Sequence, residues 1–264
     1  MIDLDLLRLQ AVKTGLGIKY LSKEERISIL LSQLHEIFPD DIVLKGGTAL
    51  NRGYLYPIQK GRFSEDIDLD FCRHLPLKDK ITNIKTLMKK INEFEVLTPR
   101  ILHRTLRFDC QYVNQLDEKD RVQVEFYLSE KTPALSPTNI LLQSQYLPVS
   151  ATLFTVYSLE DLFGQKLIAL YNRGEGKDIY DVFYTLDIEF DIDILKESLI
   201  QLFNHYHIKQ NYMDFIQELI KKIDDMQLNS KYIGNSTNHF IPYNLRPDWR
   251  IFIKMLKEKI SQKL

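Results

Sequence analysis

Cysteine is scarce in this chain: only Cys72 and Cys110 occur among its 264 residues. Two cysteines this far apart form neither a zinc-ligand motif nor a disulfide framework, which excludes zinc modules and small disulfide-stapled domains. Each is expected to be a small buried hydrophobic side chain. The scarcity of cysteine fits a reducing compartment, and we expect a cytoplasmic protein.

Long hydrophobic runs are absent as well, and so is an excess of charge of either sign. No apolar stretch is long enough to cross a bilayer, and Asp3 and Asp5 stand where a targeting segment has basic residues, so we expect neither a membrane span nor a signal segment. The formal net charge is −1, with 35 basic and 36 acidic residues. Such a balance supplies no global attraction for nucleic acid, so RNA contact would need local basic patches.

Internal repeats and low-complexity tracts are also missing, and the length suits one large domain or two small ones. Helices are expected from the N-terminus to about Thr14 and from Ser22 onward, where Ser22 and Glu25 make a capping-box pair. The hydrophobic spacing then predicts strands at 42–44, 67–71, 104–112 and 121–127 and helices at 48–54 and 78–91.

A segment with three prolines and several serines and threonines, residues 131–150, marks the expected boundary between domains. Beyond it the patterns are helical, at 159–171, 177–186, 194–206, 212–226 and 249–260. We therefore expect an α+β fold, with a mixed domain over residues 1–150 and a helical domain over residues 151–264.

The most informative pattern is the alternation of aspartates in Asp66-Ile67-Asp68. Because a strand repeats every two residues, Asp66 and Asp68 project from the same face. Two adjacent carboxylates repel each other unless a cation lies between them. Magnesium, which binds one or two carboxylates together with substrate phosphates, is the natural occupant. The pattern predicts metal-dependent chemistry on a nucleotide.

A glycine pair, Gly46-Gly47, precedes these aspartates at a strand-to-helix junction, with Thr48 near the helix cap. Glycine lets backbone amides approach a triphosphate closely, and a helix start adds partial positive charge. Such a pair alone is often only structural, and the aspartates that follow make it informative. Arg62 and Ser64 are further candidates to contact phosphate oxygens, with a loop arginine and a turn serine as the alternative.

A third carboxylate is expected, because a two-metal site usually recruits one from a neighbouring strand. Glu125 lies within the apolar run Val122–Phe126, where a charged side chain is unusual and indicates a specific role. It is therefore the first candidate for this metal ligand. Asp109 is a weaker candidate. A solvent-facing glutamate is the alternative reading of Glu125.

A second group of charged residues follows the expected boundary. Lys166 and Arg173 are one heptad apart and share a helical face, and Lys166 is a candidate to neutralise triphosphate charge in the transition state. Asp178 and Asp181 share the first turn of the next helix, which is expected to begin at Lys177. The alternative is that acidic residues favour helix starts and that charged faces are solvated.

Taken together, these residues resemble the AbiEii nucleotidyltransferase family, the toxins of AbiE-type toxin–antitoxin systems, to which the mycobacterial MenT toxins are related. The motifs that carry the resemblance are Gly46–Leu50, Arg62-x-Ser64-x-Asp66-Ile67-Asp68-Leu69-Asp70, and Lys166 before Arg173-x-x-x-Lys177-Asp178-x-x-Asp181. They extend from about Lys45 to Phe183, and their combined order is specific although each piece is common.

The resemblance implies a DNA-polymerase-beta-like nucleotidyltransferase core with N-terminal helices in residues 1–150 and a helical C-terminal domain in residues 151–264. It implies an enzyme that uses Mg²⁺ and a nucleoside triphosphate to add nucleotides to an RNA acceptor such as the tRNA 3′ end, which blocks aminoacylation. A cognate antitoxin and a role in abortive infection, a form of phage defence, are implied as well.

The family's motif carboxylate falls on Asp66, with Asp68 as its partner, and the motif lysine falls on Lys166. The late motif aspartate falls on Asp178, with Asp181 as a further position of that motif. Many relatives have arginine where this chain has Lys177, a change that keeps the charge but removes the planar fork that binds phosphate bidentately. The interval between the glycines and the aspartates is longer than in compact nucleotidyltransferases.

Acceptor binding is expected to use local basic residues. The candidates are Lys85, Lys89, Lys90, Arg100, His103, Arg104 and Arg107. Two other functions stay open: nucleotidylation of a protein hydroxyl, and a non-catalytic nucleotide-binding or interaction module. The second charged group, which small protein-modifying nucleotidyltransferases lack, favours an RNA acceptor, and the intact Asp66, Asp68 and Lys166 favour catalysis.

Overall fold

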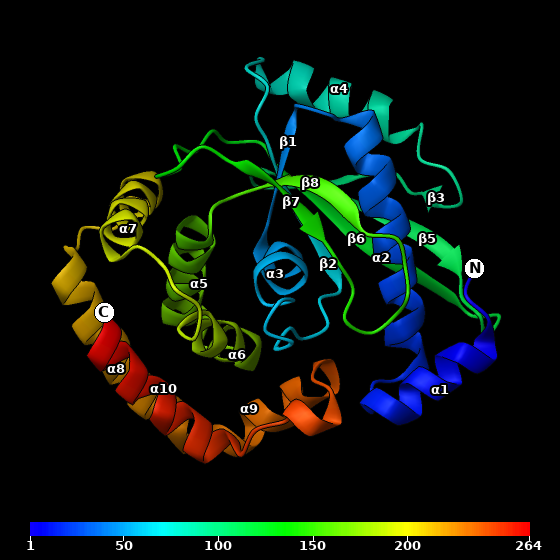
Figure 1. Cartoon of the computed structure of the whole chain (residues 1–264). Coiled ribbons are helices and arrows are strands. Elements are labelled where there is room, and N and C mark those ends of the chain that lie inside the picture. The colour runs from blue at the N-terminus through cyan, green and yellow to red at the C-terminus, as the bar shows by residue number, and fades with distance from the viewer. The chain divides into compact units, whose positions relative to one another are not determined.

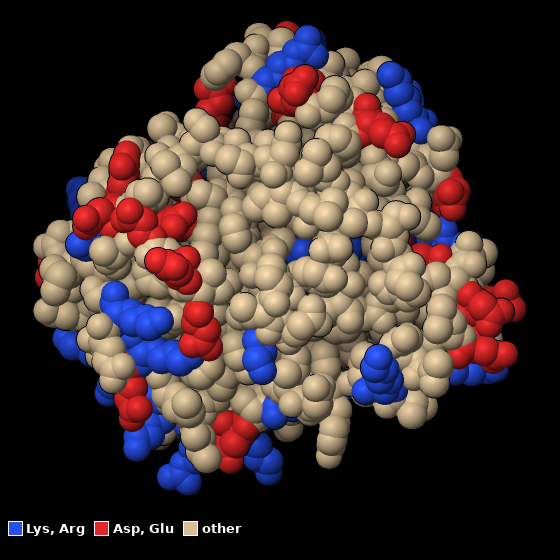
Figure 2. Space-filling model, in the orientation of Figure 1, with Lys and Arg blue, Asp and Glu red and all other residues tan.

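The computed structural model describes all residues from Met1 to Leu264, which separate into two compact units (Figure 1). The first unit comprises residues 1–130 and 137–157, and the second comprises residues 131–136 and 158–264. No helix is long and apolar enough to cross a membrane. On the face drawn in Figure 2, both basic and acidic side chains are present around a mostly uncharged centre.

The first unit is a mixed sheet with helices. Its elements are α1 (Leu4–Thr14), α2 (Ile18–Ile37), β1 (Ile42–Lys45), α3 (Gly46–Ala49), the π-helix η1 (Leu50–Tyr54), β2 (Asp66–Phe71), α4 (Leu77–Met88), β3 (Glu95–Val96), β4 (Arg100–Leu102), β5 (Thr105–Val113), β6 (Lys119–Tyr127), β7 (Thr138–Leu142) and β8 (Thr152–Val156). The strand order is β3-β5-β6-β2-β1-β8-β7, and β4 also pairs with β5. β2 is parallel to β6 and β1 is parallel to β8, whereas the other pairs are antiparallel.

The alternation of side chains gives this sheet two unlike faces. In β5 and β6 the even-numbered residues from Leu106 to Phe126 are mostly buried and apolar, and α2 packs against them, with Phe38 at its C-terminal end in ring contact with Phe126 (Figure 1). The odd-numbered residues of both strands are mostly polar and partly exposed. β2 continues the polar face with its aspartates, because the register sets Asp68 beside Glu125.

The second unit is helical. Its elements are α5 (Leu159–Arg173), α6 (Gly176–Thr185), α7 (Ile192–Tyr206), α8 (Tyr212–Leu228), α9 (Ser230–Thr237), the 3₁₀ turns η2 (Asn238–Phe240) and η3 (Tyr243–Leu245), and α10 (Trp249–Lys263). Ser158, Asp191, Asn211 and Asp248 each cap a helix by accepting a hydrogen bond from a backbone amide. α5 packs beside α7, and α8 beside α10, around one apolar core (Figure 1).

Two local predictions at helix starts are wrong. α2 begins at Ile18, so Ser22 and Glu25 lie inside it and form no capping box. Both side chains are buried and bind distant groups, because Ser22 donates to Gln115 and Glu25 accepts from the same glutamine amide. Thr48 likewise lies inside α3 instead of at its cap, and its hydroxyl donates to the Asp66 carbonyl at 2.5 Å.

The expected boundary at residues 131–150 contains a strand. Thr138–Leu142 form β7, which pairs antiparallel with β8, so residues 137–157 belong to the sheet unit. Residues 131–136 belong instead to the helical unit, where the amides of Ala134 and Leu135 donate to Asp161. The three prolines lie outside both strands, as the loss of a ladder donor requires.

Candidate active site

Asp66 and Asp68 lie on the polar face of β2, and both are partly exposed. The neighbouring strands set the residues beside them: Asp68 is opposite Lys45 of β1 and Glu125 of β6, and Asp66 is opposite Gln123 of β6. The alternation predicted for the two aspartates is therefore present. Side chains from three strands meet on one face around Asp68.

The glycine pair lies against this aspartate. Gly46 has a φ of +70°, a conformation that side-chain-bearing residues rarely adopt, and a Cβ atom there would overlap Asp68 Oδ2. A Cβ atom at Gly47 would lie 2.7 Å from Ser64 Oγ and 3.0 Å from Arg62 Nη2. Both glycines are thus required by side chains that approach the turn, and the pair, the serine, the arginine and the aspartate form one surface.

Arg62 and Ser64 differ in how firmly they are held. Arg62 is buried, its backbone amide donates to Asn51 Oδ1 at 2.7 Å, and its Nη1 donates to the Phe63 carbonyl at 2.9 Å. Ser64 is partly exposed, and its hydroxyl makes no hydrogen bond within the sheet unit. The serine therefore retains its capacity to bind a ligand oxygen, whereas the arginine fixes the loop that presents the serine.

The acidic pair fits a hard divalent cation. Within the sheet unit, the Asp68 carboxylate has neither a hydrogen-bond donor nor an ion-pair partner. The carboxylate oxygens of Asp66 and Asp68 are metal ligands of the kind that Mg²⁺ prefers. No three acidic, histidine or cysteine side chains come together as a complete metal site in this chain. Asp66 and Asp68 would therefore need further oxygen ligands, from the substrate or from one more side chain, to hold such an ion.

The two candidates for a third carboxylate are held by arginines. Glu125 accepts from Arg107 Nη2 at 2.6 Å, so it is in the expected register but already paired. Asp109 is engaged more fully, because it accepts from Arg100 at 3.0 Å and from Gln123 at 3.2 Å. These contacts also occupy two of the arginines expected to attract RNA.

A network of mostly buried side chains lies next to the carboxylates, on the same face of the sheet. Lys45, the residue before the glycines, forms an ion pair with Asp70 and lies 4.5 Å from the ring centroid of Tyr127. The Tyr157 hydroxyl donates to the same aspartate at 2.7 Å. Asp70 is only 3% exposed, so its charge is compensated within the protein and it is not placed to bind a metal. Sequence reasoning missed Lys45 and Tyr157, and only the lysine's position next to the glycines hinted at a role.

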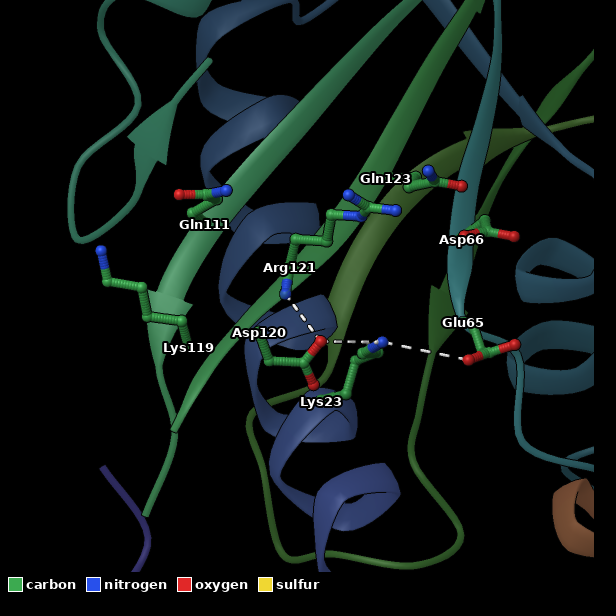
Figure 3. Close-up of a pocket in the computed structure, with 8 residues that line it drawn as sticks. All are labelled: Lys23, Glu65, Asp66, Gln111, Lys119, Asp120, Arg121 and Gln123. Carbon is green, nitrogen blue, oxygen red and sulfur yellow. Dashed lines mark hydrogen bonds and ion pairs between the residues drawn. The ribbon is translucent and has the colours of Figure 1, made fainter. Parts of the chain in front are cut away.

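A pocket of about 440 Å³ opens beside Asp66 (Figure 3). We call it the β6 pocket; its lining residues are Lys23, Glu65, Asp66, Gln111, Lys119, Asp120, Arg121 and Gln123. Sequence reasoning missed it, although the alternation of polar residues along 119–125 was a signal that this strand face is not covered by the core. It lies entirely within the sheet unit.

In the helical unit, the second charged group forms a buried ion-pair cluster. Lys166 Nζ lies 3.2 Å from Asp178 Oδ1 and 2.9 Å from Asp181 Oδ2, and both aspartate side chains are 0% exposed. Arg173 adds two hydrogen bonds to Asp178, at 2.6 and 2.9 Å. The structure therefore brings Lys166, Arg173, Asp178 and Asp181 together. Lys177 lies apart from them, with its ammonium 4.9 Å from the Phe240 ring centroid.

Comparison with known proteins adds a family and a fold. A family model described as "Nucleotidyl transferase AbiEii toxin, Type IV TA system" matches residues 29–262. Among solved structures, the nucleotidyltransferase toxin MenT4 from Mycobacterium tuberculosis H37Rv has a TM-score of 0.67 at 16% identity, over 100% of this chain and 91% of that chain. JHP933 from Helicobacter pylori has a TM-score of 0.56 at 15% identity, over 94% and 96% of the two chains.

A putative nucleotidyltransferase from H. pylori has the same TM-score, 0.56, at 15% identity, over 94% of this chain and 98% of that chain. No curated protein matches the sequence. At these identities the structural similarity establishes the fold, and the predicted α+β nucleotidyltransferase architecture is confirmed.

Proposed function

The chain belongs to the AbiEii nucleotidyl transferase toxin family of type IV toxin–antitoxin systems, and we propose that it is a magnesium-dependent enzyme that transfers nucleotides from a nucleoside triphosphate to an RNA acceptor such as the tRNA 3′ end. The family supports a nucleotidyltransferase toxin with a cognate antitoxin. The metal, the RNA and a cytoplasmic site of action are parts of the proposal.

One observation carries the proposal: the glycine turn, Ser64 and Asp68 form a continuous surface in which neither glycine tolerates a side chain. Gly46 is partly exposed, so its backbone can meet a phosphate chain, and the Ser64 hydroxyl is available to donate to a phosphate oxygen. Asp66 and Asp68 supply carboxylates for a cation that binds with those phosphates. A turn that served only to reverse the chain would not need two glycines facing these particular side chains.

The roles of the protein groups follow from their surroundings. Asp66 and Asp68 would hold the magnesium ion, which when bound supplies neutralising charge for an in-line displacement at the α-phosphorus. The ion pair between Lys45 and Asp70 keeps β1 and β2 in register beneath the glycine turn. Glu125 is proposed as the third carboxylate, held in its orientation by Arg107.

In the helical unit, Lys166 is proposed as the cation that neutralises phosphate charge during transfer. Asp178 and Asp181 are proposed as positioning residues, because both contact the lysine ammonium and both are fully buried. Arg173 braces Asp178 from the other side. Lys177 is kept as a candidate phosphate contact near the start of α6.

The test is a transfer assay with the wild type, an EDTA control and three variants. Purified protein is incubated with each α-³²P-labelled nucleoside triphosphate, Mg²⁺ and total RNA, and RNA is then separated from protein. We expect label in RNA, and none with EDTA or with Asp66→Asn or Asp68→Asn. Asp40→Asn, which removes an exposed aspartate carboxylate away from the site, serves as the matched control and should retain activity. An Asp66→Asn protein that still labels RNA would refute the assignment.

The same assay separates the other two functions. Label on protein in place of RNA would indicate nucleotidylation of a protein hydroxyl. Binding of a triphosphate without transfer to either fraction would indicate a nucleotide-binding module.

A further inference from the structure

β2 lies between two different surfaces of the sheet unit. On one side, β1 leads into the glycine turn, whose Gly46 contacts Asp68. On the other side, β6 runs parallel to β2 and sets Gln123 opposite Asp66. The β6 pocket opens on this second side, and Asp66 is one of its lining residues (Figure 3).

The chemistry of in-line displacement gives these two sides different occupants. The attacking hydroxyl and the leaving pyrophosphate lie on opposite sides of the phosphorus that is attacked. If the phosphate chain lies over the glycines, the acceptor approaches from the side away from them, and β6 is the strand on that side of β2. The β6 pocket is the cavity on that side next to the acidic pair.

We propose that the β6 pocket binds the 3′-terminal nucleotides of a single-stranded RNA acceptor, with Lys119 and Arg121 contacting its phosphates and Gln111 and Gln123 contacting its bases. This inference rests on the proposed transfer to RNA and locates the acceptor within it. About 440 Å³ is near the lower end of the range for ligand pockets, so the cavity takes a terminal nucleotide and not a duplex.

Two of the cationic side chains that line the pocket, Lys119 and Arg121, are available to bind phosphate groups of a ligand. Lys23 lies 3.2 Å from Asp120 and 3.9 Å from Glu65, so its positive charge is taken up by these two carboxylates (Figure 3). Lys119 is exposed and has no acidic partner, and Arg121 is exposed, with a contact of only 3.5 Å to Asp109. Both project from the same face of β6, two residues apart, as contacts along a phosphate backbone require.

The two glutamines supply base recognition. Gln123 donates its amide to Asp109 at 3.2 Å, which fixes the side chain and leaves its carbonyl oxygen to accept. Gln111 makes no side-chain hydrogen bond in the structure, so its amide offers both a donor and an acceptor. Unstacked RNA bases are recognised through such contacts to their edges. A pocket for a protein hydroxyl would not need this pair of amides beside two exposed cations.

The experiment measures binding and transfer separately. Fluorescence anisotropy of a 5′-labelled single-stranded oligoribonucleotide, whose 3′ end is left free, is followed with wild type, Lys119→Gln/Arg121→Gln and the control Lys78→Gln, an exposed lysine on α4 outside the pocket. The double variant should weaken binding about tenfold and reduce the magnitude of the slope of log K against log salt by about 1.4, since each phosphate contact on a single strand contributes about 0.7. The control should match wild type.

Transfer kinetics then test the location. In wild type and variants, the KM for RNA is measured at saturating triphosphate and the KM for triphosphate at saturating RNA. The double variant should raise the KM for RNA about tenfold and leave the KM for triphosphate within about twofold. Gln111→Ala should change the relative rates for RNAs that end in different bases, whereas the cation variants should slow all of them alike.

Failure of this inference is distinguishable from failure of the proposed function. If wild type transfers nucleotide to RNA and the double variant keeps the wild-type KM for RNA and salt slope, the acceptor lies elsewhere. If RNA binds through the pocket but receives no label, the transfer proposal fails and the binding site stands. Labelling of protein with no RNA binding overturns both.

Discussion

Gly46 and Asp68 are in direct contact across the β1–β2 pair, because a methyl group on residue 46 would overlap Oδ2 of the aspartate. Residue 46 also has a φ of +70°, so backbone strain and steric overlap both exclude a side chain there. Two motifs that are separate in the sequence are thus one physical unit. The glycine keeps open the space that the aspartate and a bound cation would share.

Gly46→Ala is expected to reduce transfer at least 100-fold. The left-handed conformation alone costs about 1–2 kcal/mol for alanine, and relief of the overlap displaces Asp68 from its position. Initial rates and thermal unfolding are measured together. Gly53→Ala is the matched control, since its new methyl group would meet Leu142 at 3.5 Å, an ordinary contact. Equal activity of the two variants would show that the glycine–aspartate contact has no catalytic importance.

Glu125→Gln is expected to raise the Mg²⁺ concentration needed for half-maximal transfer severalfold. Glu125 is in register with Asp68 and is oriented by Arg107 at 2.6 Å, so it is the first candidate for the third carboxylate. A magnesium titration of the transfer rate measures the effect. Asp109→Asn, in the same sheet face but bound by Arg100, should leave the magnesium requirement unchanged. If Asp109→Asn raised the magnesium requirement and Glu125→Gln did not, Asp109 would be the third carboxylate in place of Glu125.

The parts of the site predicted from the sequence are those that depend on local periodicity. Asp66 and Asp68 share one face of β2 because successive side chains of a strand point to opposite faces. Lys166 and Arg173 share one face of α5 because seven residues nearly complete two helical turns. The family was recognisable from the order of these motifs, and the match to residues 29–262 confirms it.

The parts that could not be predicted depend on long-range pairing. The Ser22–Glu25 capping box had the correct spacing, but both side chains are buried against Gln115, about ninety residues away in the sequence. The prediction that Cys72 is buried is wrong in the same way: it follows β2 directly and is exposed, whereas Cys110 is buried within β5. Short strands such as β7 gain their stability from a neighbouring strand and carry little signal of their own.

Cys72 is expected to react with a thiol reagent in the native protein, and Cys110 only after unfolding. Burial, with the nearby charge of Asp109, raises the pKa of Cys110 to about 12 from an ordinary value of 9.0, so almost no thiolate forms at pH 8. Because the unfolded chain ionises first, this group also lowers stability as pH rises from about 9 toward 12. Counting reactive thiols at pH 8 with and without urea tests the assignment, and two fast thiols in the native protein would contradict it.

Lys166→Met is expected to lower the free energy of unfolding by about 3–5 kcal/mol and to abolish transfer. The substitution removes the ammonium 2.9 Å from Asp181, a carboxylate with 0% exposure, and leaves a buried charge without its lysine. Urea unfolding and initial rates are measured on the same samples. The matched control is Lys257→Met, whose partner Asp224 is exposed, so its effect on stability should stay below about 1 kcal/mol.

The double variant Lys166→Met/Asp181→Asn separates structure from chemistry. With the lysine and one carboxylate both neutral, much of the lost stability should return, because the buried charge is no longer uncompensated. Transfer should nevertheless remain absent, since neutralisation of phosphate charge requires the ammonium itself. Recovery of activity together with stability would instead mean that Lys166 only joins α5 to α6, and its proposed role in transfer would have to be abandoned.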